Sequence, residues 1–193
     1  MYEYIQGQLV ELNPTYAVID TGNIAYFINI SLNTYSGLEG KEGVKLYLHQ
    51  VVREDAQLLF GFAEKQEREL FRLLITVSGI GSNTARMMLS SLQPIELETA
   101  ILESNVNVLK SVKGIGLKTA QRVIIDLKDK IGKTDTSEVL NIPESGIKKE
   151  EALSALVMLG FNKTAVDKTL SKVIKENPDF SVEELIKIAL KRL

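Results

Sequence analysis

The feature that most constrains this chain is an internal repeat: one five-residue string occurs twice, 35 residues apart. The first copy is Val77–Gly81, VSGIG, and the second is Val112–Gly116, VKGIG. Aligning residues 73–92 with residues 108–127 gives eight identities in twenty positions. Self-similarity at a fixed spacing indicates a duplicated structural unit. We therefore predict two copies of a helix, a tight Gly-x-Gly turn and a second helix.

A turn of this kind leaves backbone N–H groups unpaired at the beginning of a helix, where they can bind phosphate. Glycine permits the sharp turn and, having no Cβ, lets a phosphate approach the backbone closely. Two such sites on one domain fit a ligand with two phosphate strands, so we predict nucleic-acid binding through the backbone rather than the base edges. The candidate DNA-binding residues are Gly79, Gly81, Ser82, Thr84, Lys113, Gly114, Gly116, Lys118, Thr119 and Arg122.

The alternative is that the two Gly-Ile-Gly turns only close tight corners between helices. The distribution of charge favours nucleic acid, because residues 106–133 carry 7 Lys and Arg against 2 Asp and Glu. Residues 1–64 carry 3 and 8, respectively. The second copy therefore lies in a basic segment, and the acidic N-terminal part should repel or steer a polyanion. Ile80 and Ile115 should be buried under either interpretation.

Composition excludes several classes of function. The sequence has no Cys, which excludes disulfides, thiol catalysis and Cys-ligated metal sites. No Walker-type phosphate-binding string occurs, so we expect no ATP hydrolysis and no cofactor in this chain. The acidic, aromatic start does not resemble a signal peptide, and no apolar run approaches the length of a membrane span. We expect a cytoplasmic, nucleoid-associated protein with no membrane partner.

The order of sequence patterns predicts three folded parts. Residues 1–63 alternate between polar and apolar positions and contain hairpin signals at Asp20–Asn23 and Arg53–Asp55, which favours a five-stranded OB-type β-barrel. Residues 64–132 are helical and contain the repeat. Residues 133–147, rich in polar residues, Gly and Pro, predict a flexible linker. Residues 148–193 predict a bundle of three helices, so the expected fold class is multi-domain α+β.

With these features together, the chain resembles the RuvA family, whose members bind Holliday junctions in the bacterial branch-migration machine. A five-stranded barrel, paired helix-hairpin-helix motifs and a tethered three-helix tail occur in that order, over essentially the whole chain. The most specific segments are Val51–Phe62, VVREDAQLLFGF, and Gly114–Ala120, GIGLKTA. The resemblance implies a non-catalytic subunit that holds four-way junctions open in recombination and in the repair of DNA damage, within the SOS response.

The resemblance also gives Glu54 and Asp55 a role as an acidic pin, which repels phosphates at the junction crossover and limits binding to plain duplex. From the residues alone, two adjacent carboxylates at a turn are exposed and anionic, which agrees in kind. Two alternatives stay open for this pair. The carboxylates could simply solvate a turn, or they could assist a metal-dependent nuclease, although no third acidic ligand lies nearby in sequence.

For the tail, the resemblance implies docking on the RuvB-type ATPase motor, and it points to Leu156, Leu159 and Phe161 as apolar anchors. The alternative is that these three side chains only fill the core of the bundle. The further partners implied are four-way junction DNA and a RuvC-type resolvase. The implied assembly is a homotetramer, or an octamer on DNA, so that four copies match four arms.

The chain departs from the family at the first hairpin. Members of the family often have a Lys two residues after the second Gly of the turn, whereas here Ser82 and Asn83 follow Gly81. That site should use backbone N–H groups and hydroxyls, so the second hairpin, with Lys118, should bind more strongly. Two other classes of function compete with junction binding. One is a helix-hairpin-helix DNA-processing enzyme, either a nuclease or a glycosylase; the glycosylase would need a catalytic Asp downstream of a hairpin, and Asp126 inside an apolar helix does not fit. A single-strand binder would need a basic, aromatic barrel.

Overall fold

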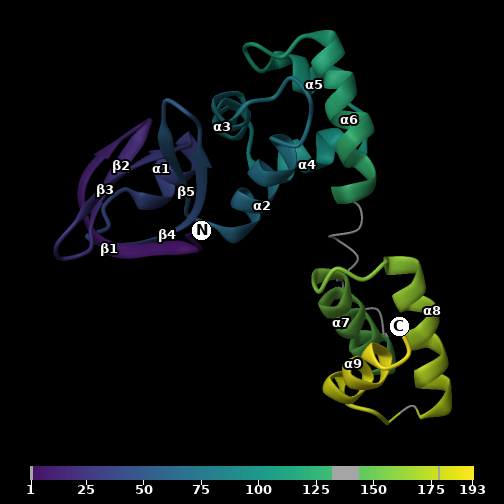
Figure 1. Cartoon of the computed structure of the whole chain (residues 1–193). Helices are drawn as coiled ribbons and strands as arrows, with labels where there is room; N and C mark the ends of the chain where they lie inside the picture. The colour runs from purple at the N-terminus through teal and green to yellow at the C-terminus, as the bar shows by residue number, and fades with distance from the viewer. Residues whose placement is uncertain (1, 132–143, 178) are drawn as a thin grey trace. The chain divides into compact units, whose positions relative to one another are not determined.

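The computed structural model describes residues 2–131, 144–177 and 179–193. Contacts divide the chain into two compact units, Met1–Asp135 and Thr136–Leu193 (Figure 1). The first unit holds the predicted barrel and the predicted helical domain together. The predicted linker over residues 133–147 lies outside the described residues up to residue 143. Its last four residues are helical, because the first helix of the second unit begins at Glu144.

The barrel is closed and five-stranded, as the alternating pattern predicts, with the strand order β1-β2-β3-β5-β4. Neighbouring strands are antiparallel except β3 and β5, which pair in parallel through Asn29 with Phe60 and Ile30 with Gly61. A helix between β3 and β4, which the sequence analysis does not predict, begins after the N-cap residue Ser31. The elements are β1 (Tyr4–Asn13), β2 (Tyr16–Asp20), β3 (Ala25–Ile30), α1 (Leu32–Leu38), β4 (Gly43–Val52) and β5 (Gln57–Phe62).

The helical domain follows directly and contains both copies of the repeat. Its helices pack around one core of apolar side chains, which recur about every three to four residues along the longer helices, as expected for a buried face. The elements are α2 (Lys65–Leu74), α3 (Ser82–Ser91), α4 (Pro94–Leu102), α5 (Val106–Ser111) and α6 (Leu117–Ile131). The helices predicted to follow the two Gly-Ile-Gly turns are therefore confirmed as α3 and α6.

Barrel and helical domain form one unit because they share a core. Phe60 and Phe62 of β5 pack on Phe71 of α2, with ring centroids 5.2 and 5.0 Å apart. On the same helix Glu67 is buried, and its carboxylate accepts hydrogen bonds from the hydroxyls of Ser31 and Thr34, which respectively precede and belong to α1. Burial raises the pKa of Glu67, because removal from water disfavours the charged carboxylate. A buried, hydrogen-bonded side chain of this kind fixes the two domains in register.

The second unit is a three-helix bundle with its own small core. Its helices are α7 (Glu144–Met158), α8 (Lys163–Glu176) and α9 (Val182–Leu190). The predicted capping box is present, since the Ser181 hydroxyl accepts from the N–H of Glu184 while the Glu184 carboxylate accepts from the N–H of Ser181. The core consists of aliphatic side chains from all three helices, among them Leu156, Leu170 and Leu185.

Candidate nucleic-acid interface

The two Gly-Ile-Gly turns have the same backbone geometry. Gly79 has a φ of +94° and Gly114 a φ of +90°, a region that other residues rarely adopt. In the first turn the N–H of Ile80 donates to the carbonyl of Val77 at 3.0 Å. In the second, the N–H of Ile115 donates to the carbonyl of Val112 at 3.1 Å. The repeated sequence therefore forms the same turn twice.

The second glycine of each turn precedes the helix that follows. Gly81 is the N-cap of α3 and provides no side-chain cap, and Gly116 stands at the same place before α6. The first N–H groups of each helix therefore lack an intrahelical partner, at the positive end of the helix dipole. An added Cβ at Gly79, Gly81, Gly114 or Gly116 would meet no atom within 4 Å. The turns are open to solvent, so a phosphate could approach the backbone there.

The middle isoleucines anchor the turns in the core, as predicted. Ile80 and Ile115 are each 5% exposed and belong to one continuous cluster of buried side chains. Ala85 and Ala120, one turn further along α3 and α6, are fully buried in the same cluster. Because Ile80 and Ile115 belong to the same core, both turns are held on a single rigid support. The alternative, in which the turns only close helix–helix corners, accounts for the buried isoleucines and for the positive φ of Gly79 and Gly114. Phosphate binding requires in addition that the turns be open, and they are.

The two hydroxyl residues predicted to bind DNA at the first turn differ in burial. Thr84 is half-buried, whereas Ser82 is 5% exposed. The hydroxyl of Ser82 is enclosed and finds no hydrogen-bond partner among the described residues. This placement argues against the predicted hydroxyl contact from Ser82 to a phosphate, because the oxygen lies beneath the surface. Of the two predicted hydroxyl residues, Thr84 is the one that remains partly exposed to solvent.

The second turn is the more basic of the two. Lys113 and Lys118 are exposed on either side of Gly114 and Gly116, and Thr119 is half-buried. Arg122 lies one turn further along α6 and is exposed, yet its guanidinium already has a protein partner. Its Nη1 donates to the carbonyl of Ser78 in the first turn at 3.2 Å. The predicted residues thus come together as two neighbouring turns linked by an arginine.

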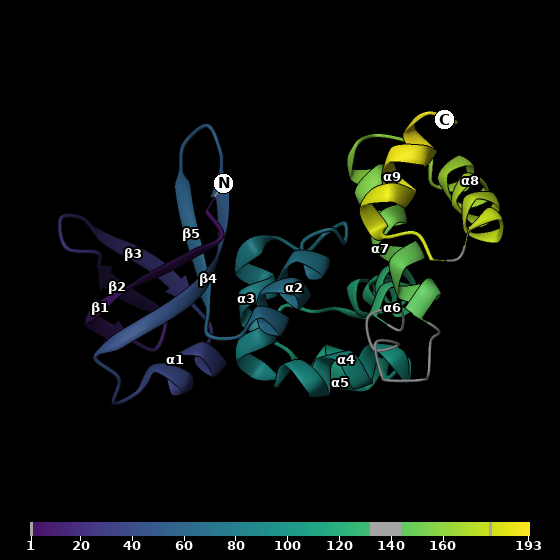
Figure 2. The same cartoon turned by 90° about the horizontal axis from the view of Figure 1, so that it is seen from below.

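The predicted acidic pin is an exposed turn at the end of the β4–β5 hairpin, which stands out from the barrel (Figure 2). Strand pairing ends at Val52 and Gln57, and the N–H of Arg53 donates to the carbonyl of Ala56 at 2.8 Å across the turn. Glu54 and Asp55 occupy its tip. No group of three or more His, Cys, Asp or Glu in the described part of the chain could hold a metal ion.

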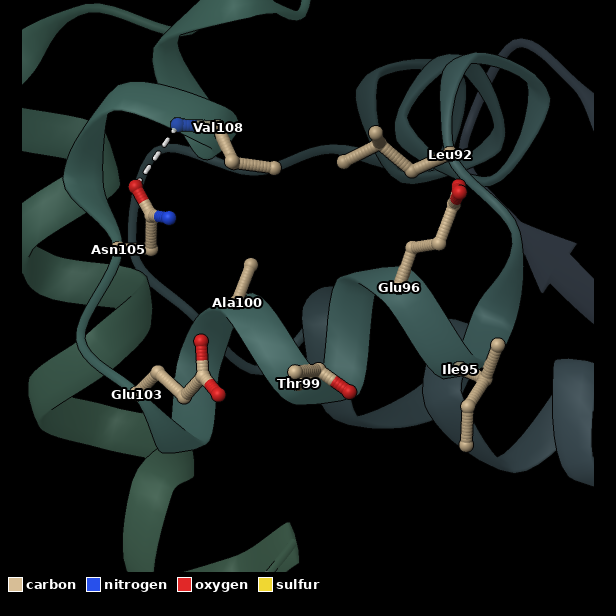
Figure 3. Close-up of a pocket in the computed structure, with 8 residues that line it drawn as sticks. All are labelled: Leu92, Ile95, Glu96, Thr99, Ala100, Glu103, Asn105 and Val108. Atoms are coloured by element: carbon tan, nitrogen blue, oxygen red, sulfur yellow. Dashed lines mark hydrogen bonds between the residues drawn. The ribbon is translucent and has the colours of Figure 1, made fainter.

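A separate pocket of about 360 Å³ lies between the end of α3, α4 and the start of α5 (Figure 3). Leu92, Ala100 and Val108 give it apolar walls, and the carboxylates of Glu96 and Glu103 stand at it. The carboxylate of Glu96 also caps α4, where it accepts from the N–H of Gln93 at 2.9 Å. Carboxylates repel phosphate, so this pocket is unsuited to the DNA backbone. Within the helical domain, the open turns are the places suited to phosphate.

In the C-terminal bundle the structure corrects one predicted anchor. Leu156 is fully buried with Ala152 and Leu153, a helical spacing that could have predicted core positions. Leu159 is 63% exposed. Phe161 is half-buried, because Gly160 has a φ of +95° and turns the chain so that Phe161 packs on the core.

Beside Leu159, Met158 is 87% exposed at the end of α7. Val157 beside it is 39% exposed. We refer to Val157, Met158 and Leu159 as the apolar corner of the bundle. Large apolar side chains that stay exposed to water often mark an interaction site.

Three family models match the chain in succession. Residues 1–61 match the RuvA N terminal domain, residues 71–129 match the SAM-like Helix-hairpin-helix tandem, and residues 148–193 match the RuvA C-terminal domain.

Among residues 2–131, 144–177 and 179–193, no helix combines the length and apolar character needed to cross a membrane.

The chain is also similar over its full length to curated proteins described as Holliday junction branch migration complex subunit RuvA. It is 54% identical to that of Christiangramia forsetii over 193 residues and to that of Bacteroides thetaiotaomicron over 201 residues. It is 49% identical to that of Flavobacterium psychrophilum over 193 residues. Each alignment covers 100% of both chains.

Proposed function

This chain belongs to the RuvA family, and on that premise we propose that it binds four-way DNA junctions as a non-catalytic subunit of a branch-migration complex. The observation that carries the proposal is one turn geometry built twice on one core, at Gly79–Gly81 and Gly114–Gly116. Two positive helix ends on a rigid support suit the two backbones of a duplex arm. Such contacts depend on shape and charge and carry no base sequence.

A comparison of DNA shapes tests this function. In a gel-shift experiment at moderate salt without ATP, the protein should bind a synthetic four-way junction in strong preference to linear duplex and single strand. Equal affinity for all three would contradict junction binding and favour a generic DNA binder. Adding Mg²⁺ to the same samples tests the competing nuclease function, for which cleavage of the junction is required.

We further propose that Glu54 and Asp55 lie at the crossover and repel the DNA backbone there, which helps to separate strands. Their exposure at the tip of a projecting hairpin supports this role. Replacing both with Gln and Asn should raise affinity for linear duplex by about tenfold at low salt, because two repulsive charges are removed.

The matched control for the acidic turn is the pair Glu42→Gln and Glu103→Gln, which removes two charges from exposed positions elsewhere on the first unit. If net charge alone mattered, this pair would raise duplex affinity equally. That outcome, or an unchanged affinity in the Glu54 and Asp55 variant, would contradict the role of the turn.

For the C-terminal bundle we propose docking on a RuvB-type ATPase through the apolar corner, with ATP hydrolysed by the motor. The exposure of Met158 and Leu159 supports this site, and the burial of Leu156 removes that residue from it. Leu159→Asp should abolish binding to the motor, because a charge cannot enter an apolar interface. Ser154→Asp, at an exposed position earlier on α7, is the control and should bind normally.

The proposed assembly is a homotetramer that places four copies against four arms, with a second tetramer closing an octamer on the DNA. A RuvC-type resolvase is proposed as a further partner, and the cytoplasm, with the nucleoid, as the location. Mass measurement in solution, with and without a four-way junction, tests the assembly. A monomer at all concentrations would contradict it.

A further inference from the structure

Arg122 connects the two hairpins. It belongs to α6, the helix of the second hairpin, but its Nη1 donates to the carbonyl of Ser78 in the first turn, 44 residues earlier in the chain. Ser78 immediately precedes Gly79, the residue with positive φ on which the shape of that turn depends. The bond therefore holds the first turn against the second helix at its most conformationally demanding point.

The first copy of the repeat has no arginine at the position of Arg122. In the alignment of the two copies, Arg122 corresponds to Met87 of α3, which is 42% exposed. The arginine of the first copy, Arg86, turns to the barrel instead. Its Nη1 donates to the carbonyl of Thr15 at 3.0 Å and to Oδ1 of Asn29 at 3.1 Å. The first hairpin is thus fastened on two sides, to the barrel by Arg86 and to the second hairpin by Arg122.

On the basis of the proposed function, we infer that Arg122 is a positioning residue that fixes the separation of the two phosphate-binding turns. The sequence pattern predicts a direct phosphate ligand at this place, whereas the structure shows the guanidinium engaged with a backbone carbonyl. A carbonyl at a phosphate-binding turn carries partial negative charge, which an arginine donor offsets. Two turns held at a set separation lose less freedom on binding than two independent turns, which strengthens binding.

The two roles predict different behaviour before any DNA is present. If Arg122 holds the first turn, Arg122→Met should speed amide hydrogen exchange at Ile80, whose N–H donates to the carbonyl of Val77, by about tenfold in the free protein. Methionine is the residue that α3 carries at the matching position, so it suits an exposed helical site. If Arg122 only contacts phosphate, exchange in the free protein should not change.

Lys118→Met provides the matched comparison on the same helix. Lys118 is exposed beside the second turn, and its loss should leave exchange at Ile80 as in the wild type while lowering junction affinity. It should also reduce the slope of log affinity against log salt by about 0.9, the value for one phosphate contact. Arg122→Met should lower junction affinity by about tenfold with a smaller change in slope, since one charge-assisted hydrogen bond is lost within the protein.

The inference stands if Arg122→Met speeds exchange in the first turn and weakens junction binding. Unchanged exchange would overturn it, as would faster exchange with wild-type affinity, because the separation of the turns would then not matter for DNA. Thermal unfolding verifies that the variant is folded, and Arg122→Gln replaces it if it is not. Failure of the wild-type protein to prefer a junction would instead contradict the proposed function, and the exchange measurement would still decide whether Arg122 holds the turn.

Discussion

The two hairpin turns share one backbone conformation and one buried core but differ in the polar and charged side chains around them. The first is fastened to the barrel through Arg86, and its following residue, Ser82, is buried. The second is flanked by exposed Lys113 and Lys118, and its following residue, Leu117, is 51% exposed. Duplication thus preserved the turn while its surroundings specialised, the first copy for attachment and the second for charge. This difference predicts unequal contributions to DNA binding.

The largest expected effect comes from placing a negative charge in each turn separately. Gly116→Glu should weaken junction binding by about a hundredfold or more, because a carboxylate would face the phosphate. Gly81→Glu should weaken it less. Gly43→Glu is the control, since an added Cβ at Gly43 also meets no atom within 4 Å. Equal losses at Gly81 and Gly116 would show that the two turns bind equally.

A smaller effect is expected from exchanging the cation between the two copies. Asn83 of the first copy corresponds to Lys118 of the second. Lys118→Asn should lower junction affinity by about tenfold and reduce the salt slope by about 0.9. Asn83→Lys should have the opposite effect on both quantities. Measuring affinity over a range of salt concentrations checks this, and an Asn83→Lys protein that binds no better than the wild type would contradict it.

The attachment of the first hairpin should appear in stability. Arg86→Met leaves the carbonyl of Thr15 and the amide oxygen of Asn29 without this donor, so the free energy of unfolding should fall by about 1–2 kcal/mol. Lys118→Met, at an exposed position of the second hairpin, should change it by less than about 0.5 kcal/mol. Denaturant unfolding of both variants checks the contrast, and equal changes would remove it.

The smallest effect concerns pH and the helix that leads into the first turn. Burial raises the pKa of Glu67 above its ordinary value of 4.5, so the folded protein binds this proton more tightly than the unfolded chain. The free energy of unfolding contributed by Glu67 should therefore fall as pH rises from about 4.5 through the raised pKa. Glu67→Gln removes this dependence, so its stability relative to the wild type should increase over that range.

Denaturant unfolding at several pH values between about 4 and 8 measures the difference in free energy of unfolding between Glu67→Gln and the wild type. Glu103→Gln, an exposed carboxyl in the same unit, is the control and should track the wild type at every pH. If the two variants behave alike, the raised pKa of Glu67 does not make the free energy of unfolding depend on pH.

Periodicity and repetition predicted most of the architecture. Alternation in Tyr16–Asp20 and the turn signal after it correspond to β2 and its hairpin to β3, and the Gly-Ile-Gly strings predicted the starts of α3 and α6. These features are local, because a strand or a helix start depends on residues near in sequence. The roles of Glu54, Asp55 and the C-terminal anchors came from the family resemblance, since composition alone is compatible with a solvated turn.

What the sequence could not predict depends on contacts between distant residues. The joining of barrel and helical domain into one unit requires Phe60 and Phe62 to face Phe71. The burial of Ser82 and the bond from Arg122 to Ser78 likewise depend on how α3 and α6 pack. Leu156 was assigned to docking although its spacing from Leu153 suited the core. Side-chain direction, rather than residue type, separates these outcomes.

The central claim is that both turns hold the DNA backbone through their N–H groups, and an NMR titration tests it most directly. Adding a four-way junction to ¹⁵N-labelled protein should shift the amide signals of Gly81, Ser82, Gly116 and Leu117 more than those of the barrel strands, with the larger changes in the second turn. Shifts confined to the barrel, with both turns unaffected, would contradict the account.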